Sequence, residues 1–522
     1  MIDYDQGMDP GTGTPVGPPV AHTSPDELDR IARAAATVAP VLARHTPAQR
    51  SAALRLVAAT LERARAKLVP LADAETGLGT ARLDSELTRT TVQLEMFAEV
   101  VAEGSCLEVV IDEADPTAVP APRPDLRRVL LPIGPVAVFA ASNFPFAFSV
   151  AGGDTASALA AGCPVVVKAH PGHPGLSARC AELVRTALAE AGLPEGSFDI
   201  VYGERAGRGL VTHPAIAAVG FTGSLAGGRA LFDLATGRPD PIPFYGELGS
   251  LNPVVVTPGG LAAHAAEIVA GFVGSFTLGA GQFCTKPGLL FLPRGHGLDQ
   301  ALAAQVAQTR LGPLLNQRIR DGFDRVASAW QGIAGVRHLA SGAGEGAADE
   351  SIVEADGYRV SPVLLAVSSM DLVERGSTLL EECFGPAALV VDYGTPAELE
   401  AALDAVPASL TATVHADPQD EAELCARLLD RFSAKAGRII WQGWPTGVAV
   451  AWAQHHGGPW PATTSPLHTS VGATAIRRFQ RPATYQNLPD QLLPPAVQRA
   501  NPWNLPRRIN GTLLPARPSV SE

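Results

Sequence analysis

The chain contains little lysine, and its negative charges outnumber its positive ones. Its 522 residues carry 52 acidic and 40 basic side chains, for a formal net charge of -12. The lysines are Lys67, Lys168, Lys286 and Lys435, so almost all positive charge comes from arginine. An acidic surface disfavours nonspecific binding to nucleic acid or to an anionic membrane. We therefore expect neither as a partner.

Paired cysteines and metal-binding spacings are also missing. The six cysteines are scattered, without a CxxC pair or a zinc-type Cys/His spacing. His455 and His456 are adjacent and lack an acidic partner at ligand spacing, so no metal site is expected. Scattered cysteines in a long chain are usually reduced, which indicates a cytoplasmic protein.

Targeting and membrane segments are not evident either. The first 23 residues lack the basic-then-apolar pattern of a signal peptide, and their glycine and proline content predicts a flexible N-terminus. Apolar runs such as 128–141 are broken by proline and glycine and are too short to span a bilayer.

The remaining pattern predicts an α/β protein with two doubly wound domains. Ser24-Pro25-Asp26-Glu27 is a helix start, and amphipathic helices follow to about Glu103. Short apolar strands then alternate with helices, and this pattern restarts near Ser250. A Gly/Ala/Glu-rich stretch from Ser341 to Glu350 is expected to be an exposed loop. The expected units are residues 1–23, 24–106 with 132–249, a projecting hairpin at 107–131, 250–440, and an irregular segment at 441–522.

Three short segments contain the side chains of a covalent reaction at a carbonyl. Cys284 follows Gly279-Ala280-Gly281, and a thiolate there could attack a carbonyl carbon. Glu247, in Gly246-Glu247-Leu248-Gly249, could activate water, and the amide of Asn143 could stabilise an oxyanion. We therefore predict Cys284, Glu247 and Asn143 as catalytic residues.

A possible phosphate-binding turn begins at Thr222. Thr222, Gly223 and Ser224 end a predicted strand, and Gly228 lies in the first turn of the helix that follows. The spacing departs from GxGxxG, so on its own a structural turn is an equal alternative.

The order and wording of these motifs resemble the aldehyde dehydrogenase superfamily, from about Ser24 to the end of the chain. The resemblance implies that Cys284 forms a thiohemiacetal and then a thioester. It further implies an oxyanion hole made of the Asn143 NH2 and the Cys284 N–H. Because Glu247 is present, hydrolysis to a free acid is expected and transfer to coenzyme A is not.

The same resemblance implies a nicotinamide cofactor. Lys168 matches the lysine that bonds the adenine ribose, and Glu382 matches the glutamate that holds the nicotinamide ribose. The full predicted cofactor set is Lys168, His170, Arg208, Thr222, Gly223, Ser224, Gly228, Leu248, Glu382 and Phe384. Relatives that prefer NAD usually carry a glutamate where this chain has Pro171, and Arg208 lies where a cation could reach a 2′-phosphate. We therefore expect NADP to be preferred and NAD to be the alternative, with Arg208 as a solvated helix residue equally open.

The tail resembles one branch, which holds α-ketoglutarate semialdehyde (2,5-dioxopentanoate) dehydrogenases and NADP-dependent fatty-aldehyde dehydrogenases. Its segments include His456-Gly457-Gly458-Pro459 and Thr469-Ser470-Val471-Gly472. Two departures stand out. Asp154 lies near a lysine of many relatives, and Leu467 replaces an arginine that could bind a carboxylate. The expected reaction is oxidation of α-ketoglutarate semialdehyde to 2-oxoglutarate.

Two alternatives remain open: oxidation of long-chain or aromatic aldehydes, and a catalytically silent scaffold. The hairpin and the tail suggest a homodimer or homotetramer.

Overall fold

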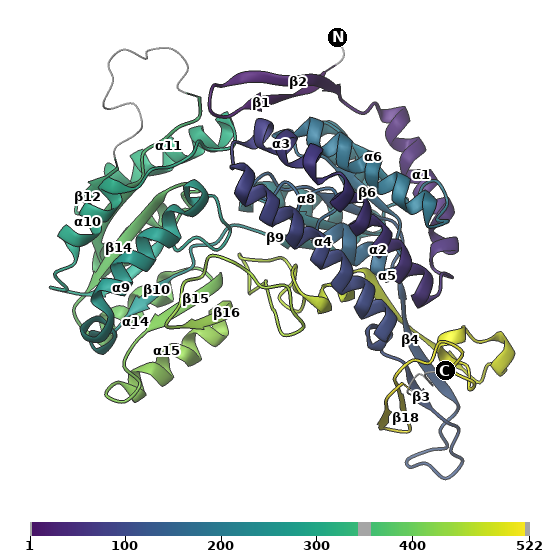
Figure 1. Cartoon of the computed structure of the whole chain (residues 1–522). Helices are drawn as coiled ribbons and strands as arrows, with labels where there is room; N and C mark the ends of the chain where they lie inside the picture. Colours follow the sequence, from purple (N-terminus) through teal and green to yellow (C-terminus); the bar gives the residue numbers. More distant parts are fainter. Residues whose placement is uncertain (1–2, 343–356, 517–522) are drawn as a thin grey trace.

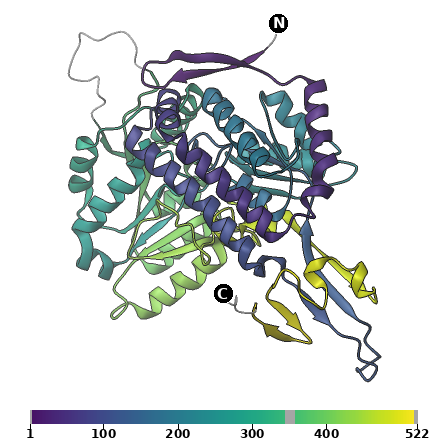
Figure 2. The same ribbon diagram turned by 45° about the vertical axis from the view of Figure 1, so that its right-hand side comes forward.

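Two β-sheets, each mostly parallel, form the centre of the molecule (Figure 1). The computed structural model describes residues 3–342 and 357–516 of the chain. A third sheet, also of five strands, projects at one end (Figure 2). The predicted α/β class, with two doubly wound domains and a β arm, is confirmed.

The first sheet has the strand order β7-β6-β5-β8-β9, with all neighbours parallel. Its strands are β5 (Val136–Phe139), β6 (Val165–Lys168), β7 (Phe198–Val201), β8 (Ala218–Thr222) and β9 (Phe244–Glu247). The chain runs outward from β5 to β7 and then returns to β8 on the other side of β5. This reversal creates a crevice at the carboxyl ends of the strands, where α/β sheets bind ligands. Lys168, Thr222 and Glu247 are the last residues of β6, β8 and β9 and therefore lie along this edge.

Apolar residues on both faces of this sheet are buried, as expected for parallel strands covered by helices. Val136 and Val138 of β5 face one core, and Ala137 and Phe139 face another. The first core contains α2 (Pro47–Arg63), α3 (Arg65–Thr76), α4 (Thr80–Glu103), η1 (Ser105–Leu107), α5 (Gly153–Ala161) and α6 (Pro174–Glu190). The second core contains α1 (Pro25–Leu42), α7 (Glu204–Thr212) and α8 (Leu225–Thr236). Ser24 caps α1 as predicted, through a 3.2 Å bond from the Glu27 N–H to its Oγ.

The second sheet has the order β12-β13-β14-β11-β10-β15-β16, and only β12 is antiparallel to its neighbour. Its strands are β10 (Val254–Val256), β11 (Leu289–Pro293), β12 (Arg337–Ser341), β13 (Val363–Ser368), β14 (Ala387–Tyr393), β15 (Ser409–His415) and β16 (Ala436–Trp441). On one face lie α9 (Pro258–Thr277) and α10 (Asp299–Gln308). On the other lie α11 (Gln317–Gln331), α12 (Ser369–Glu374), α13 (Gly376–Leu379), α14 (Pro396–Ala405) and α15 (Ala422–Lys435).

One segment is an exception to the expectation that no apolar run could cross a membrane. Residues Pro258–Gly281, which comprise α9 and η2 (Leu278–Gly281), are long and apolar enough by length and composition, with a mean hydropathy of 1.5. In the fold, Ile268, Phe272 and Phe276 of this helix pack against β10 and β11 in a hydrophobic core. The packing accounts for its apolar composition.

The third sheet, which we call the arm sheet, joins the predicted hairpin to the C-terminal segment. Its order is β17-β4-β3-β18-β19, from strands β3 (Val110–Asp112), β4 (Leu126–Pro132), β17 (Gln480–Gln486), β18 (Arg507–Ile509) and β19 (Thr512–Leu514). Between them lie η3 (Ala473–Phe479), η4 (Asp490–Leu492) and η5 (Pro495–Val497). The C-terminal segment is therefore more regular than its Pro- and Trp-rich sequence predicts, because it pairs with the hairpin.

The prediction of a flexible N-terminus is wrong for residues 4–21. Strands β1 (Tyr4–Asp9) and β2 (Thr14–Ala21) form an antiparallel hairpin over α3 and α6 (Figure 1). Burial at Gly7 fixes it in place, since a Cβ there would lie 2.4 Å from Oε1 of Glu75. Gly7 and Pro10 are buried, whereas Pro15, Gly17, Pro18 and Pro19 are exposed, so the hairpin is held by its strand pairing and by its contacts with α3 and α6. The loop expected at Ser341 to Glu350 lies, from residue 343 onward, outside the described residues.

Asp154 has a structural partner, which explains its departure from a lysine. Its Oδ1 lies 2.7 Å from Nη2 of Arg478, a side chain that is 3% exposed. Arg478 also donates to Ala475 O and Ser157 Oγ. The ion pair thus fastens η3 of the C-terminal segment to α5.

We expect Asp154→Ala to destabilise the protein by about 3–5 kcal/mol, because it leaves the Arg478 charge buried and unpaired. The urea midpoint followed by far-UV circular dichroism should fall accordingly. Asp233→Ala is the matched control, since it breaks an exposed ion pair with Arg229 and should cost at most about 1 kcal/mol. Equal midpoints for the two variants would contradict the structural role.

Candidate active site

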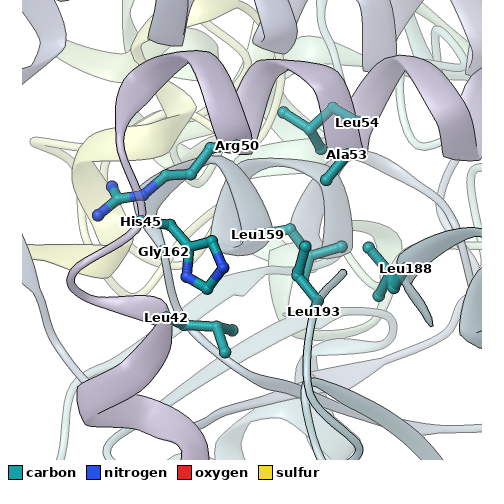
Figure 3. Close-up of a pocket in the computed structure, with 9 residues that line it drawn as sticks. All are labelled: Leu42, His45, Arg50, Ala53, Leu54, Leu159, Gly162, Leu188 and Leu193. Carbon is teal, nitrogen blue, oxygen red and sulfur yellow. The ribbon is translucent and has the colours of Figure 1, made fainter. Parts of the chain in front are cut away.

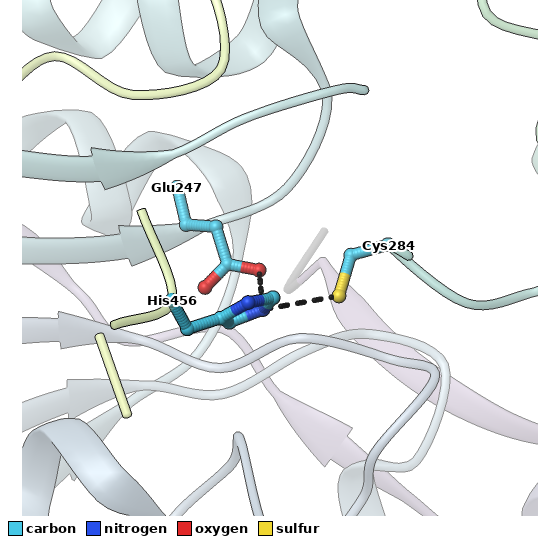
Figure 4. Close-up of side chains that lie close together, drawn as sticks. All are labelled: Glu247, Cys284 and His456. Carbon is cyan, nitrogen blue, oxygen red and sulfur yellow. Dashed lines mark hydrogen bonds and ion pairs between the residues drawn. The ribbon is translucent and has the colours of Figure 1, made fainter. Parts of the chain in front are cut away.

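Three titratable side chains from distant parts of the chain meet between the two large sheets (Figure 4). Cys284 Sγ lies 3.4 Å from His456 Nε2, and the same nitrogen lies 2.9 Å from Oε1 of Glu247. Glu247 and His456 are buried, whereas Cys284 is partly accessible. The predicted pair Glu247 and Cys284 is thus brought together, with His456 between them.

Close backbone packing positions the thiol. Cys284 follows the end of α9 and η2, where Gly279, Ala280 and Gly281 all adopt positive φ. A Cβ on Gly281 would lie 2.2 Å from the Gly385 carbonyl oxygen, so only glycine fits there. Asn252 Nδ2 then fixes the Cys284 carbonyl through a 2.8 Å bond.

The segment that carries His456 is docked on β9. The Leu248 N–H donates to Ala462 O at 2.8 Å, and the Thr464 N–H donates to Gly246 O at 3.0 Å. The His456 backbone is fixed in turn, because its N–H donates to Thr469 Oγ1. Ser470 Oγ donates to Oε2 of Glu247. The tail thus supplies both the imidazole and a hydroxyl to the carboxylate.

Burial and charge decide the protonation of this cluster. Burial, followed by the charge of Glu247, raises the pKa of the Cys284 thiol well above its ordinary value. Burial also acts to raise the pKa of Glu247, but the contacts with His456 and Ser470 outweigh it and hold this pKa below the ordinary value. Cys284 is therefore a thiol near neutral pH and needs a base. In the tautomer that carries its proton on Nδ1, His456 has a free Nε2 within 3.4 Å of the sulfur and can accept the thiol proton.

Oε1 of Glu247 is close to His456 without a well-aligned hydrogen bond. Among the described residues this buried oxygen has no hydrogen-bond partner, although it lies 2.9 Å from Nε2. Nδ1 of His456 likewise has none among them. An acceptor that faces the thiol and is free of protein donors suits a general base for water.

Asn143 lies against the thiol segment. Its Nδ2 donates to the carbonyl of Gln282 at 3.0 Å, and its own carbonyl accepts from Nη2 of Arg82 at 2.6 Å. A carboxamide has two N–H donors, so one remains for an oxyanion formed beside Cys284. The structure therefore brings Asn143 to the predicted pair.

Glu382 and Phe384 belong to a segment held by a buried lysine. Nζ of Lys286 donates to the carbonyls of Cys383, Gly385 and Ala387 at 2.6, 3.2 and 2.8 Å. Glu382 lies over Gly249, where a Cβ would be 2.3 Å from its Oε2, and burial raises its pKa. Lys286 thus keeps Glu382 beside the cysteine and the β9 loop.

The turn after β8 has the form of a phosphate-binding helix start. Ser224 caps α8 through a bond from the Gly227 N–H to its Oγ at 3.2 Å. A Cβ on Gly228 would lie 2.1 Å from Leu248 Cδ2, so this helix packs closely on the β9 loop. Thr222, Gly223, Ser224, Gly228 and Leu248 therefore form one surface, with the helix N-terminus available for an anion.

Lys168 of β6 packs against Gly207 of α7. A Cβ on Gly207 would lie 3.1 Å from Lys168 Cγ, and Arg208 follows as an exposed residue. Burial lowers the pKa of Lys168. His170 also has a pKa well below its ordinary value because of burial and the neighbouring His173.

A separate small pocket lies between α1, α2, α5 and α6 and contains none of these residues (Figure 3). It is lined by Leu42, Leu54, Leu159, Leu188 and Leu193 with Arg50 and His45. Its volume of about 10 Å³ leaves room for at most one water.

The structure corrects one sequence argument about His456. The histidine pair lacks an acidic partner in the sequence, but in space Glu247 and Cys284 both lie beside His456, and one donor atom of each lies within 4.8 Å of the others. Such a set has the donor types of a zinc ligand set. No role was predicted for His456 from the sequence. The one sequence signal for it is that Gly457 and Gly458, which permit close packing, follow it directly.

The site combines a thiol and a buried carboxylate, and it lies next to a doubly wound sheet with a phosphate-type turn. Together these features define a nucleotide-dependent enzyme that works through a thiol. The model of the aldehyde dehydrogenase family matches residues 6–460, and the chain belongs to this family. It is therefore an aldehyde-oxidising enzyme that uses NAD(P).

Two relatives resemble it along nearly their whole length. Alpha-ketoglutaric semialdehyde dehydrogenase 2 of Azospirillum brasilense is 44% identical over 97% of this chain and 95% of its own. Alpha-ketoglutaric semialdehyde dehydrogenase of Acinetobacter baylyi is 41% identical over 96% of this chain and 94% of its own. Among solved structures, 1-pyrroline-5-carboxylate dehydrogenase of Thermus thermophilus has a TM-score of 0.76 at 21% identity, covering 93% of this chain and 92% of the other. That likeness shows the shared fold.

We expect His456→Gln to slow alkylation of Cys284 by iodoacetamide at least about tenfold at pH 7, because no base then takes the proton of a thiol whose pKa is raised. Alkylation rates should be measured from pH 6 to 10. The rate for the variant should begin to rise at a higher pH than the rate for the parent. The other five cysteines are buried, so early labelling reports Cys284. His455→Gln is the matched control and should resemble the parent; equal rates for His456→Gln and the parent would refute the assignment.

Proposed function

We propose that the protein oxidises α-ketoglutarate semialdehyde to 2-oxoglutarate with NAD(P), through a covalent intermediate on Cys284. The observation that carries this proposal is the contact of Cys284 Sγ with His456 and of His456 with Glu247, at 3.4 and 2.9 Å. The choice of aldehyde is supported by the names of the two relatives at 44% and 41% identity.

In the proposed reaction, the Cys284 sulfur adds to the aldehyde carbon and its proton passes to Nε2 of His456. The second N–H of Asn143 Nδ2 and the Cys284 N–H stabilise the oxygen of the resulting thiohemiacetal. Bound NAD(P) supplies the acceptor for the hydride. Glu247 then removes a proton from the water that attacks the thioester, which releases the carboxylic acid and restores the thiol.

The residues present fit such a cofactor. Gly223 and Ser224 are exposed at the N-terminus of α8, which leaves it open for a pyrophosphate. Thr222, Gly223 and Ser224 would form the turn around it, Lys168 and His170 would line the adenosine side, and Glu382 with Phe384 the nicotinamide side. We also propose a cytoplasmic homo-oligomer that associates through the arm sheet.

The function is tested by following NAD(P)H absorbance with a panel of aldehydes: α-ketoglutarate semialdehyde, succinic semialdehyde, hexanal, decanal and benzaldehyde. We expect the highest kcat/KM for α-ketoglutarate semialdehyde, and no turnover of any aldehyde by Cys284→Ala. A higher value for decanal or benzaldehyde would replace the proposed substrate with a long-chain or aromatic one. Activity that survives Cys284→Ala would exclude the covalent mechanism.

We further propose that NADP is preferred, because Pro171 offers no carboxylate and Arg208 is exposed on α7, one residue after the Gly207 that packs on Lys168. A charge-assisted bond to the 2′-phosphate contributes about 1.5–3 kcal/mol. Arg208→Ala should therefore lower kcat/KM for NADP by roughly 10- to 100-fold and leave that for NAD nearly unchanged. Arg205→Ala, an exposed residue of the same helix, is the control. A parent enzyme that prefers NAD would overturn this assignment.

A further inference from the structure

One face of α4 turns three charged side chains toward the active-site loop. Arg82, Glu86 and Arg89 are four and three residues apart and so share a face of the helix. Oε1 of Glu86 accepts the N–H groups of Phe146 and Ala147 at 2.9 and 3.1 Å. This face is therefore fixed against the loop that begins at Asn143.

The two guanidinium groups lie over the aromatic rings that flank the site. Arg82 lies 5.3 Å from the centre of the Phe144 ring and 5.0 Å from that of Phe283. Arg89 lies 5.4 Å from the ring of Phe148, which is itself in contact with the ring of His456. Phe144 follows Asn143 and Phe283 precedes Cys284, so both cations are near the reacting thiol.

Both arginines have a buried Nη1 without a hydrogen-bond partner among the described residues, and they differ in how firmly Nη2 is held. Nη2 of Arg82 is bonded to Asn143 O at 2.6 Å, which makes Arg82 a support for the Asn143 loop. Nη2 of Arg89 has one long bond, 3.4 Å to Val448 O, and its buried Nη1 has no hydrogen-bond partner among the described residues. A buried guanidinium with an unused donor is costly unless an anion completes it.

Charge in this region is unbalanced. Glu86 is the single carboxylate on this face of α4, and it lies between two arginines. The three side chains together therefore carry a net positive charge. The charge of Arg89 reaches the active site, where it acts on both Cys284 and Glu247. Another nearby cation, Arg438, already donates from both Nη atoms to the carbonyls of Gly447 and Pro445. Of the two arginines on α4, Arg89 is the one whose charge acts on Cys284 and Glu247, and its Nη1 has no hydrogen-bond partner among the described residues.

The arginine that the sequence appeared to have lost does not belong to this space. Leu467, which replaces it, is 88% exposed. Its neighbour His468 bonds Ser465 and packs its ring against Tyr245. The Leu467 side chain points into solvent, so a charge at this position would not reach the buried thiol directly.

We propose that Arg89 binds the carboxylate at the far end of the substrate and thereby selects short aldehydes that carry one. Arg82 is a positioning residue that holds the Asn143 loop, and the phenylalanines form the walls between the carboxylate and the thiol. This inference rests on the proposed function. It extends that function by naming the group that distinguishes a semialdehyde from a neutral aldehyde.

The test compares Arg89→Met, which keeps an apolar stem under the rings, with Arg89→Lys and the parent. Arg55→Met, an exposed arginine paired with Glu95, is the matched control. Each protein is assayed with α-ketoglutarate semialdehyde and with pentanal, which has a similar chain and no carboxylate. For Arg89→Met we expect kcat/KM to fall about 10- to 100-fold for the semialdehyde and to change less than threefold for pentanal. Arg89→Lys should retain part of the preference.

A second measurement does not depend on turnover or cofactor. Iodoacetate and iodoacetamide alkylate the same thiol and differ in one negative charge, so the ratio of their rates at Cys284 reports the local cation. This ratio should fall at least about fivefold in Arg89→Met and stay unchanged in Arg55→Met. An equal loss of activity on both aldehydes, or an unchanged ratio, would overturn the role of Arg89.

The two proposals fail in distinguishable ways. If the parent enzyme shows no preference for carboxylated aldehydes, the proposed substrate is wrong, whatever the result for Arg89→Met. A parent that prefers the semialdehyde, with Arg89→Met keeping that preference, would overturn the role of Arg89 alone.

Discussion

The active site depends on a contact made by the tail of the chain. His456 Nε2 lies between Glu247 of the first sheet and Cys284 of the second, at 2.9 and 3.4 Å. It reaches that position because its segment is hydrogen-bonded to β9, at Leu248 and at Gly246. The Arg478–Asp154 ion pair fastens the continuation of the same segment to α5. Anything that loosens the tail would therefore disturb the chemistry before it disturbed either sheet.

Low solvent exposure gives each charge in this region a strong effect. Burial and then the charge of Glu247 raise the pKa of Cys284, so the thiol needs a proton acceptor at hand. Lys286 is buried and donates three hydrogen bonds to backbone carbonyls, which fixes the segment that carries Glu382. Arg82 likewise supports the Asn143 backbone. Arg89 is held less firmly than these groups, by one 3.4 Å bond to Val448 O, and its buried Nη1 has no hydrogen-bond partner among the described residues.

Sequence reasoning predicted the parts of the site that follow from local rules. Lys168, Thr222 and Glu247 end neighbouring parallel strands, so their common edge could be expected from strand and turn signals. Cys284 and Asn143 lie in small-residue loops whose amino-acid sequences are distinctive. The role of His456 could not be predicted, because it is 172 residues from Cys284 and the contact exists only after the tail has docked. The N-terminal hairpin was missed for a related reason: it is held by pairing of β1 with β2 and by contacts with α3 and α6, among them the close approach of Gly7 to Glu75, which composition alone does not reveal.

A cation that binds substrate and also acts on the nucleophile links recognition to reactivity. The charge of Arg89 counts among those that favour the Cys284 thiolate, against the opposing effect of Glu247. When a substrate carboxylate pairs with Arg89, that support is neutralised, and the thiol becomes harder to ionise at the moment the aldehyde is in place. Proton transfer to His456 then matters most for the substrate that binds best. The imidazole from the tail and the guanidinium from α4 are therefore complementary. Arg89 binds the carboxylated aldehyde, and His456 accepts the thiol proton once that binding has neutralised the charge of Arg89.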